Sequence, residues 1–195
     1  MRLDDNIGMS EIPVIETERL RLRGHRVEDF RNCAAMWGDP VVTRYIGGRP
    51  FTAEEVWARL LRYVGHWTLL GFGFWLIEER ATGSFVGEAG LAEFQREMEP
   101  SIAGVPEMGW VLSPRFHGKG YGTEVVRAIC RWGEERFGGG RMVCIIDGEN
   151  AASMRVAEKC GFRELPGATY RGQEVKLFER VGEIGDAGRA TMGVG

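Results

Sequence analysis

The chain has 195 residues, of which 44% are hydrophobic and 27% are charged, and its formal net charge is -3. This size and composition predict one soluble globular domain, and the small negative charge gives no general attraction to nucleic acid or to anionic membranes. No apolar run approaches the roughly 18 residues of a membrane span, and the first 20 residues lack the apolar centre of a secretory signal, so we expect a cytoplasmic protein.

The cysteines carry little functional signal. There are four of them, none in a C-x-x-C pair, and only three histidines accompany them. This spacing matches neither a zinc site nor a disulfide framework, so we predict buried, reduced thiols and no metal. The residues concerned are Cys33, Cys130, Cys144 and Cys160.

The first third of the chain predicts a strand followed by two helices. Residues 1–14 have no periodicity and predict a flexible lead-in, whereas 18–24 alternate leucines with charges, as a half-buried strand does. Residues 30–37 repeat apolar side chains at helical spacing. Thr52 and Glu55 then form the capping-box pattern that begins a second helix.

The middle of the chain predicts an antiparallel meander. Residues 73–79, 84–94 and 107–113 are short aromatic and β-branched runs separated by turn residues. Residues 95–106 contain two prolines and a glycine and predict an exposed loop.

The second half begins with a cluster of glycines at positions 118, 120 and 122, directly ahead of a helical pattern that ends at the Gly-Gly-Gly of 138–140. Residues 142–146 form an unbroken apolar run, typical of a strand covered on both faces. Residues 150–162 predict a further helix and 173–180 a last strand. No repeat or linker divides the chain, so residues 15–180 predict a single domain with a mixed α/β sheet.

A glycine cluster at the entrance to a helix is costly to order, which indicates either a strained turn or a ligand that comes close to the backbone. Helix N-termini present unpaired N–H groups and bind anions such as phosphate. Two common phosphate motifs do not fit, because a P-loop would need glycine in place of Ser113 and a dinucleotide fingerprint would need glycine in place of Thr123.

The motif that does fit is R-x-x-G-x-G, formed by Arg115, Gly118 and Gly120 after a predicted strand. It resembles the coenzyme A signature of the GNAT N-acetyltransferase superfamily.

The resemblance extends beyond the signature. Residues 15–23 (IETERLRLR), 109–124 (GWVLSPRFHGKGYGTE) and 150–162 (NAASMRVAEKCGF) are together similar to the RimJ/RimL-like ribosomal-protein N-terminal acetyltransferases. The resemblance covers roughly residues 15–180, nearly the whole chain. The three motifs in this order are far more specific than the six-residue signature alone.

The resemblance implies an α/β fold with a mixed, mostly antiparallel sheet of about seven strands and about four helices, splayed at the strand that precedes the CoA-binding helix. It implies acetyl transfer from acetyl-CoA to a protein N-terminal amine or a small-molecule amine, with no metal. It implies no nucleic-acid or membrane partner, and a monomer or homodimer. The flexible tails would be residues 1–14 and 182–195.

By resemblance, the pyrophosphate lies on the N–H groups of the glycine loop and the pantetheine arm pairs with the free edge of the splayed strand. Gly109 in that strand suggests a bulge or a close backbone approach. Arg155 and Lys159 would add positive charge. The expected cofactor-binding residues are Trp110, Val111, Leu112, Arg115, Gly118, Lys119, Gly120, Tyr121, Gly122, Thr123, Asn150 and Ser153.

The catalytic residues expected by resemblance are Glu107, as the base that deprotonates the amine, and Ser153, as the donor of a proton to the departing thiolate. Glu88 is the alternative base and Tyr170 the alternative acid. His117 lies within the glycine loop and is expected to be a loop residue. The acceptor cleft would be framed by the two N-terminal helices and by residues 95–106.

A different reading is a non-catalytic acyl-CoA-binding domain that senses the coenzyme or regulates a partner. A third is a nucleotide-phosphate module, which the failed motifs disfavour. Loss of turnover with retained acetyl-CoA binding in a Glu107→Gln variant would favour the enzyme.

Overall fold

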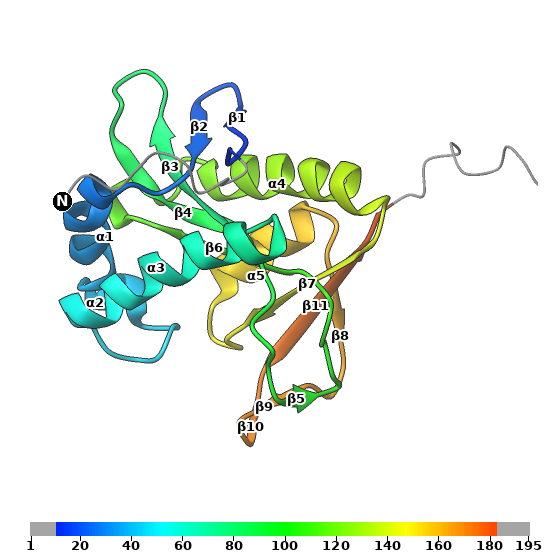
Figure 1. Cartoon of the computed structure of the whole chain (residues 1–195). Coiled ribbons are helices and arrows are strands. Elements are labelled where there is room, and N and C mark those ends of the chain that lie inside the picture. Colours follow the sequence, from blue (N-terminus) through cyan, green and yellow to red (C-terminus); the bar gives the residue numbers. More distant parts are fainter. Residues whose placement is uncertain (1–10, 183–195) are drawn as a thin grey trace, which may run out of the picture.

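The computed structural model describes residues 11–182, which form an eight-stranded sheet, a small three-stranded sheet and five α-helices (Figure 1). The order of the main sheet is β1-β2-β3-β4-β6-β7-β11-β8. Its strands are β1 (Ile15–Glu16), β2 (Leu20–Arg23), β3 (Phe74–Glu79), β4 (Phe85–Ala92), β6 (Glu107–Leu112), β7 (Arg141–Ile146), β8 (Arg163–Leu165) and β11 (Lys176–Val181). The small sheet contains β5 (Met98–Glu99), β9 (Thr169–Tyr170) and β10 (Gln173–Glu174). The helices are α1 (Phe30–Trp37), α2 (Pro40–Thr43), α3 (Ala53–Leu70), α4 (Tyr121–Phe137) and α5 (Ala151–Lys159).

Helices cover the two faces of the main sheet unequally. On one face, α4 and α5 pack on a large apolar cluster that includes Leu91, Met108 and Met142. On the other face, α1 and α3 cover the first half of the sheet, where Leu76 packs against Trp37. The small sheet lies below the second half, at the bottom of Figure 1. The face with α3 and the small sheet therefore has a gap between two coverings.

The predicted helix boundaries follow local chemistry. Thr52 and Glu55 form the expected capping box, with Thr52 Oγ1 accepting from the Glu55 N–H at 3.2 Å and Glu55 accepting from the Thr52 N–H at 2.8 Å. This satisfies two of the unpaired donors at the start of α3. The helix ends at Gly71, and α4 ends at Gly138, both with the left-handed backbone that glycine adopts without strain.

The sheet opens between β6 and β7, as expected for the strand before the CoA-binding helix. β6 pairs with β4 along its whole length, from Glu107 opposite Ala92 to Leu112 opposite Gly87. Its other neighbour, β7, runs parallel and pairs with it only at Glu107 and Val143. Beyond that point the edge of β6 has no strand partner among the described residues.

Several elements were not predicted because they depend on tertiary pairing. Residues 95–106, expected as an exposed loop, contain β5, and the side chains of Met98 and Ile102 are buried. The short strands β8 to β10 and the single-turn helix α2 likewise lack a sequence period. With β1 and β8 the main sheet has eight strands, where about seven were expected, and α2 brings the helices to five, where about four were expected.

One part of the predicted N-terminal tail is ordered against the core. Residues 11–14, placed in the flexible lead-in, instead contact the core, since Ile12 packs on it and Trp75 Nε1 donates to the Pro13 carbonyl at 2.7 Å. The remaining predicted tails, 1–10 and 183–195, lie outside the described residues.

Three smaller expectations concern single residues. All four cysteines are free and buried, as predicted. Gly109 forms no bulge, because it pairs in register with Gly90. Its missing side chain instead leaves room for the ring of Phe74, whose Cζ would lie only 2.7 Å from an added Cβ. Within residues 11–182, no helix has both the length and the apolar character needed to cross a membrane.

Candidate active site

The glycine loop leaves a run of backbone donors free. From Gly118 to Thr123, none of the six backbone N–H groups donates a hydrogen bond to another described residue. Gly118 and Gly120 have φ angles of 75° and 80°, which bend the chain into the helix with its amides exposed. No side chain caps the start of α4. Six free donors at the positive end of a 17-residue helix suit a pyrophosphate group.

A clamp from the turn between β1 and β2 holds this loop, and nothing in the sequence indicated it. Glu124, in the first turn of α4, accepts from Thr17 Oγ1 at 2.6 Å and from Arg19 Nε at 2.7 Å. Arg19 also donates through Nη1 to the Lys119 carbonyl at 2.9 Å and lies over the Tyr121 ring. Thr17 and Arg19 belong to the quoted stretch 15–23 and Glu124 to 109–124, but a contact across more than 100 residues has no local signal.

Glu124 remains charged in this setting. Burial acts to raise its pKa, but the hydrogen bonds from Thr17 and Arg19 and the Arg19 charge outweigh burial and lower it. The carboxylate is therefore balanced by Arg19 beside an anion-binding helix end.

The open edge of β6 presents only alternate backbone groups. The Ser113 N–H donates to the Val86 carbonyl of the β4 segment at 2.9 Å, while the Pro106 carbonyl accepts from Val143 in β7 at 3.0 Å. Successive residues of a strand direct their backbone groups to opposite edges, so Val111 faces β4 whereas Trp110 and Leu112 face the opening. Of the three residues predicted here, these two offer N–H groups to a ligand.

The start of α5 faces the same region with a capped terminus. Asn150 Oδ1 accepts from the Ser153 N–H at 3.1 Å and so caps the start of α5. Its side-chain NH₂ group is a separate donor. The Ser153 hydroxyl has no hydrogen bond to a described residue, and the residue is half-buried.

A basic groove of about 670 Å³ adjoins the glycine loop and includes Gly120 and Thr123 in its lining. Lys159, from the predicted basic set, lines it, while Arg115 instead donates to the Phe85 carbonyl at 3.1 Å. The other basic side chains of the groove are Arg19, Arg127 and Arg131.

Glu107 begins β6 on the opposite face from α4, and it is buried with 7% of its surface exposed. Arg96 binds it in a bidentate manner, with Nε at 2.5 Å and Nη2 at 2.8 Å from its oxygens. A carboxylate offers about four lone-pair positions, so the bidentate contact with Arg96 leaves positions for a second donor. Sequence placed Glu107 here but gave no sign of Arg96.

The combination of free helix-end amides, an open strand edge and a buried carboxylate can be compared with known proteins. Residues 19–163 match the family model described as an acetyltransferase (GNAT) domain. The chain belongs to the GNAT acetyltransferase family.

Similar proteins support the same family. The uncharacterized protein YkkB of Bacillus subtilis is 32% identical over 171 residues, covering 84% of this chain and 93% of that protein. The uncharacterized N-acetyltransferase p20 of Bacillus licheniformis is 26% identical, covering 76% and 81%. An acetyltransferase structure from Agrobacterium tumefaciens, 26% identical, has a TM-score of 0.76 and covers 90% of this chain and 98% of that one.

Two more distant structures share the GNAT fold. One is spermidine N-acetyltransferase from Vibrio cholerae in complex with CoA and spermine, with a TM-score of 0.66, 17% identity and coverage of 86% and 98%. The other is ribosomal-protein-S5-alanine acetyltransferase from Vibrio fischeri, with a TM-score of 0.66, 18% identity and coverage of 88% and 97%. These two structures show the fold alone, whereas the family model and the N-acetyltransferase relatives identify the chain as an acyltransferase.

The alternative base of this acetyltransferase, Glu88, is enclosed in the protein. It accepts from Trp37 Nε1 at 2.7 Å and lies 3.0 Å from His25 Nε2, with 1% of its surface exposed. Burial acts to raise its pKa, but the contacts with His25, Trp37 and Cys33 prevail and lower it. Glu88 lies four residues along β4 from Ala92, the partner of Glu107, so the two carboxylates are well separated.

The same cluster contains three atoms of metal-ligand type. The Nε2 of His25, the Sγ of Cys33 and an oxygen of Glu88 lie within 4.8 Å of one another. Both Glu88 oxygens already take part in hydrogen bonds, which accounts for the cluster as a buried polar network.

The remaining candidates lie on opposite sides of the opening. Tyr170, the alternative acid, is on β9 beside Arg96, whose guanidinium lies 5.0 Å from the ring centroid. His117 Nε2 lies 2.9 Å from the Leu112 carbonyl, so this side chain closes the end of the open β6 edge.

Proposed function

We propose that this protein transfers the acetyl group of acetyl-CoA to a primary amine by direct attack of the amine on the thioester. The acceptor is a protein N-terminal amine or a small-molecule amine. The observation that carries the proposal is the run of six N–H groups at the start of α4 that are free within residues 11–182, next to a strand edge without a strand partner in the same range.

Acetyl-CoA supplies an activated acetyl group: the amine nitrogen bonds to the carbonyl carbon, the carbon–sulfur bond breaks, CoA leaves as the thiolate and the amine loses a proton. The N–H groups of residues 118–123 hold the pyrophosphate, as the glycine loop permits. The N–H of Trp110 or Leu112 stabilises negative charge on the thioester oxygen, an interaction worth roughly 2.7–4 kcal/mol per donor.

Glu107 accepts the proton from the amine, directly or through one water. Arg96 fixes its orientation by the bidentate contact and leaves lone-pair positions for the incoming proton. The thiolate of CoA is a good leaving group, so a proton donor is less critical; Ser153 is our first choice and Tyr170 the second.

We place the protein in the RimJ/RimL-like subfamily on the strength of the three ordered motifs at 15–23, 109–124 and 150–162. The Vibrio fischeri structure, a ribosomal-protein acetyltransferase, shares the fold of this chain, as membership of this subfamily would require. The amines acetylated by such relatives differ, so the acceptor of this chain has to be argued from its own residues.

The test is a Glu107→Gln variant, with acetyl-CoA binding and acetylation of an amine panel measured separately. We expect kcat to fall about 10²- to 10⁴-fold, the usual contribution of a general base, with the Kd of acetyl-CoA unchanged. The matched control is Glu93→Gln, because Glu93 holds the same loop through the N–H groups of Gln95 and Gly104 but does not contact Glu107.

Equal losses of kcat in the two variants would show that Glu107 acts by holding the 95–106 segment in place and not by accepting a proton. Binding of acetyl-CoA without turnover of any amine by the unmodified protein would instead indicate a coenzyme sensor.

A further inference from the structure

A row of three arginines alternates with two aromatic rings beside the carboxylate at the start of β6. The guanidinium groups of Arg62 and Arg96 lie 5.2 Å and 4.8 Å from the centroid of the Phe94 ring. Those of Arg96 and Arg171 lie 5.0 Å and 5.2 Å from the centroid of Tyr170. These five residues, which we call the arginine row, run from α3 across the 95–106 segment to the small sheet.

Two arginines of the arginine row are not held by a carboxylate. Among residues 11–182, Arg96 has one carboxylate partner, Glu107, while Arg62 and Arg171 form no ion pair. The nearby Glu93 accepts from backbone N–H groups with both oxygens and not from an arginine. The guanidinium donors of Arg62 and Arg171 therefore have no ion-pair partner within the described part of the chain.

The charges of neighbouring arginines act on Arg62. Partial desolvation lowers the pKa of Arg62, and the charges of Arg59 and Arg96 lower it further. Arg59 also lacks a carboxylate partner among the described residues; it donates to the Tyr63 hydroxyl at 3.3 Å. Like charges gathered in this way repel each other, and an anionic ligand would relieve that repulsion.

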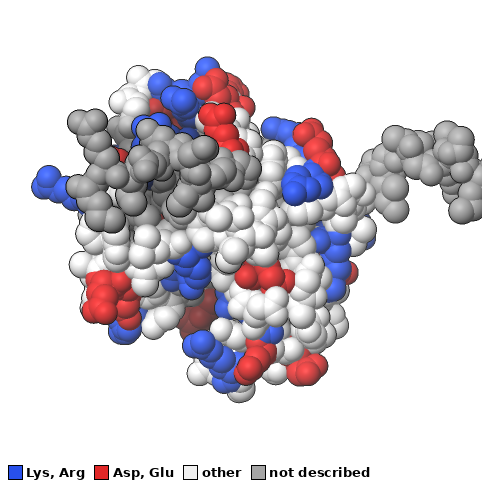
Figure 2. All heavy atoms as spheres, in the orientation of Figure 1, with Lys and Arg blue, Asp and Glu red and all other residues white. Residues whose placement is uncertain are grey.

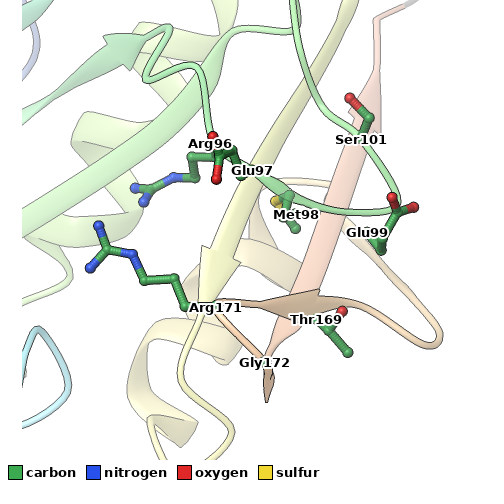
Figure 3. Close-up of a pocket in the computed structure, with 8 residues that line it drawn as sticks. All are labelled: Arg96, Glu97, Met98, Glu99, Ser101, Thr169, Arg171 and Gly172. Carbon is green, nitrogen blue, oxygen red and sulfur yellow. The ribbon is translucent and has the colours of Figure 1, made fainter.

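The row is open to a ligand. Arg62 and Arg171 are exposed, and Figure 3 shows Arg96 and Arg171 extending to the same side, away from Glu99 and Ser101. Arg96 and Arg171 line a pocket of about 400 Å³ that also includes Glu97 and Glu99 on its rim. On the face drawn in Figure 2, basic side chains lie on both sides of a recess that shows acidic atoms in its depth.

The anion that fits this row is not the pyrophosphate of CoA. The free N–H groups of residues 118–123 begin α4, which covers one face of the sheet, whereas Arg62 is on α3, which covers the other. Glu107 also faces the α3 side. The arginine row thus lies where the acceptor, and not the coenzyme, reaches the base.

We propose that the acceptor is an amine carrying a carboxylate or phosphate a few bonds from its nitrogen. The anionic group lies beside Arg96, where Arg62 and Arg171 add positive charge from the two sides of the row, while the amine lies against Glu107. This inference rests on the proposed acetyl transfer, and it narrows the acceptor class: a polycation such as a polyamine would meet these guanidinium groups and be repelled.

The experiment uses four amines with the same two-carbon spacer and different end groups: ethanolamine, β-alanine, phosphoethanolamine and ethylenediamine. Their Kd values are measured by NMR titration of the full-length protein saturated with CoA, which requires no turnover. Acetylated product is measured separately with acetyl-CoA.

We expect β-alanine or phosphoethanolamine to bind at least ten-fold more tightly than ethanolamine, since hydrogen bonds to ionised groups are strong. The tighter of the two identifies the anion as carboxylate or phosphate. Ethylenediamine should bind more weakly than ethanolamine.

The variants test whether the row causes this preference. Arg62→Gln and Arg171→Gln should each reduce the ratio of anionic to neutral binding at least three-fold. Arg31→Gln, which removes an exposed arginine of α1, should leave the ratio unchanged. Because Arg171 is on the surface, its variant tests the row even if Arg62→Gln fails to fold.

Tighter or equal binding of ethanolamine or ethylenediamine, or a preference for anions that survives in both variants, would overturn the inference. If the anion preference depends on the arginines but none of the four amines is acetylated, the anion site stands and the proposed acetyl transfer fails. If all four amines are acetylated with equal kcat/KM, the acetyl transfer stands and the anion site fails.

Discussion

Replacing Arg19 with Gln tests how the clamp around Glu124 controls coenzyme binding. Arg19 contacts Glu124 through Nε at 2.7 Å and Nη2 at 2.6 Å, and its side chain is 43% exposed while that of Glu124 is 16% exposed. Without Arg19, the Glu124 carboxylate stays near the helix end that is proposed to hold a pyrophosphate. We expect the Kd of CoA to rise.

The size of the effect follows from Coulomb's law. At about 8 Å, some one and a half helical turns, two unit charges repel by roughly 2 kcal/mol at an effective dielectric constant of about 20, and physiological salt reduces this to about 1 kcal/mol. That corresponds to about a five-fold increase in Kd. The loss of a partly exposed ion pair and of the stacking on Tyr121 lowers the free energy of unfolding by about 1 kcal/mol.

The assay is calorimetric titration of the full-length variants with CoA at two salt concentrations. Arg19→Gln combined with Glu124→Gln should restore the affinity, because the uncompensated charge is gone. Glu124→Gln alone should tighten binding, since it frees Arg19. The difference between Arg19→Gln and the unmodified protein should shrink at high salt. A double variant as weak as Arg19→Gln at both salt concentrations would refute the electrostatic reasoning and assign Arg19 a steric role in shaping the loop.

Two other variants test the loop and the core. Gly120→Val should abolish CoA binding, with a backbone cost of about 1–2 kcal/mol at its φ of 80°; Gly138→Val, at a φ of 67° at the far end of α4, has the same strain and should keep the affinity, so equal affinity in both by calorimetry would contradict the phosphate cradle. Glu88→Gln tests the buried network, where burial acts to raise the Glu88 pKa but His25 and Trp37 lower it below 4.5 overall. A lowered pKa supplies stability that is present above the unfolded pKa and is lost as the pH falls through the folded one. Denaturant unfolding should therefore show a loss of roughly 1.5–3 kcal/mol at neutral pH and a weaker decline below pH of about 4.5, and an unchanged acid slope would contradict this account.

The exposed backbone N–H groups before α4 could be predicted from sequence because their signal is local. The glycine loop is continuous in the chain, and its helix follows directly. The place of Glu107 at the start of a strand was likewise predicted from the local pattern. The clamp of Thr17, Arg19 and Glu124 could not be found in this way, since Glu124 is more than 100 residues along the chain from the other two.

The part of the candidate site proposed to bind the acceptor depends on strand pairing between distant segments, which no short stretch of sequence shows. Arg96 meets Glu107 because β5 pairs with β9 and draws the 95–106 segment over the second half of the sheet. The sequence of that segment, with its prolines and glycine, is that of an ordinary loop. Glu88 was a reasonable alternative base until the structure enclosed it between His25 and Trp37.

The sequence by itself determined the order of the main strands and helices, the cap of α3 and the glycine loop before α4, because apolar periodicity, capping residues and glycine act over a few neighbouring positions. Tertiary structure alone decided which backbone groups of β6 face the opening, that Glu88 is enclosed by His25 and Trp37, and where the arginines of the arginine row gather. These properties arise from side chains brought together over long stretches of chain, where packing and the balance of charges, and not local propensity, set the outcome.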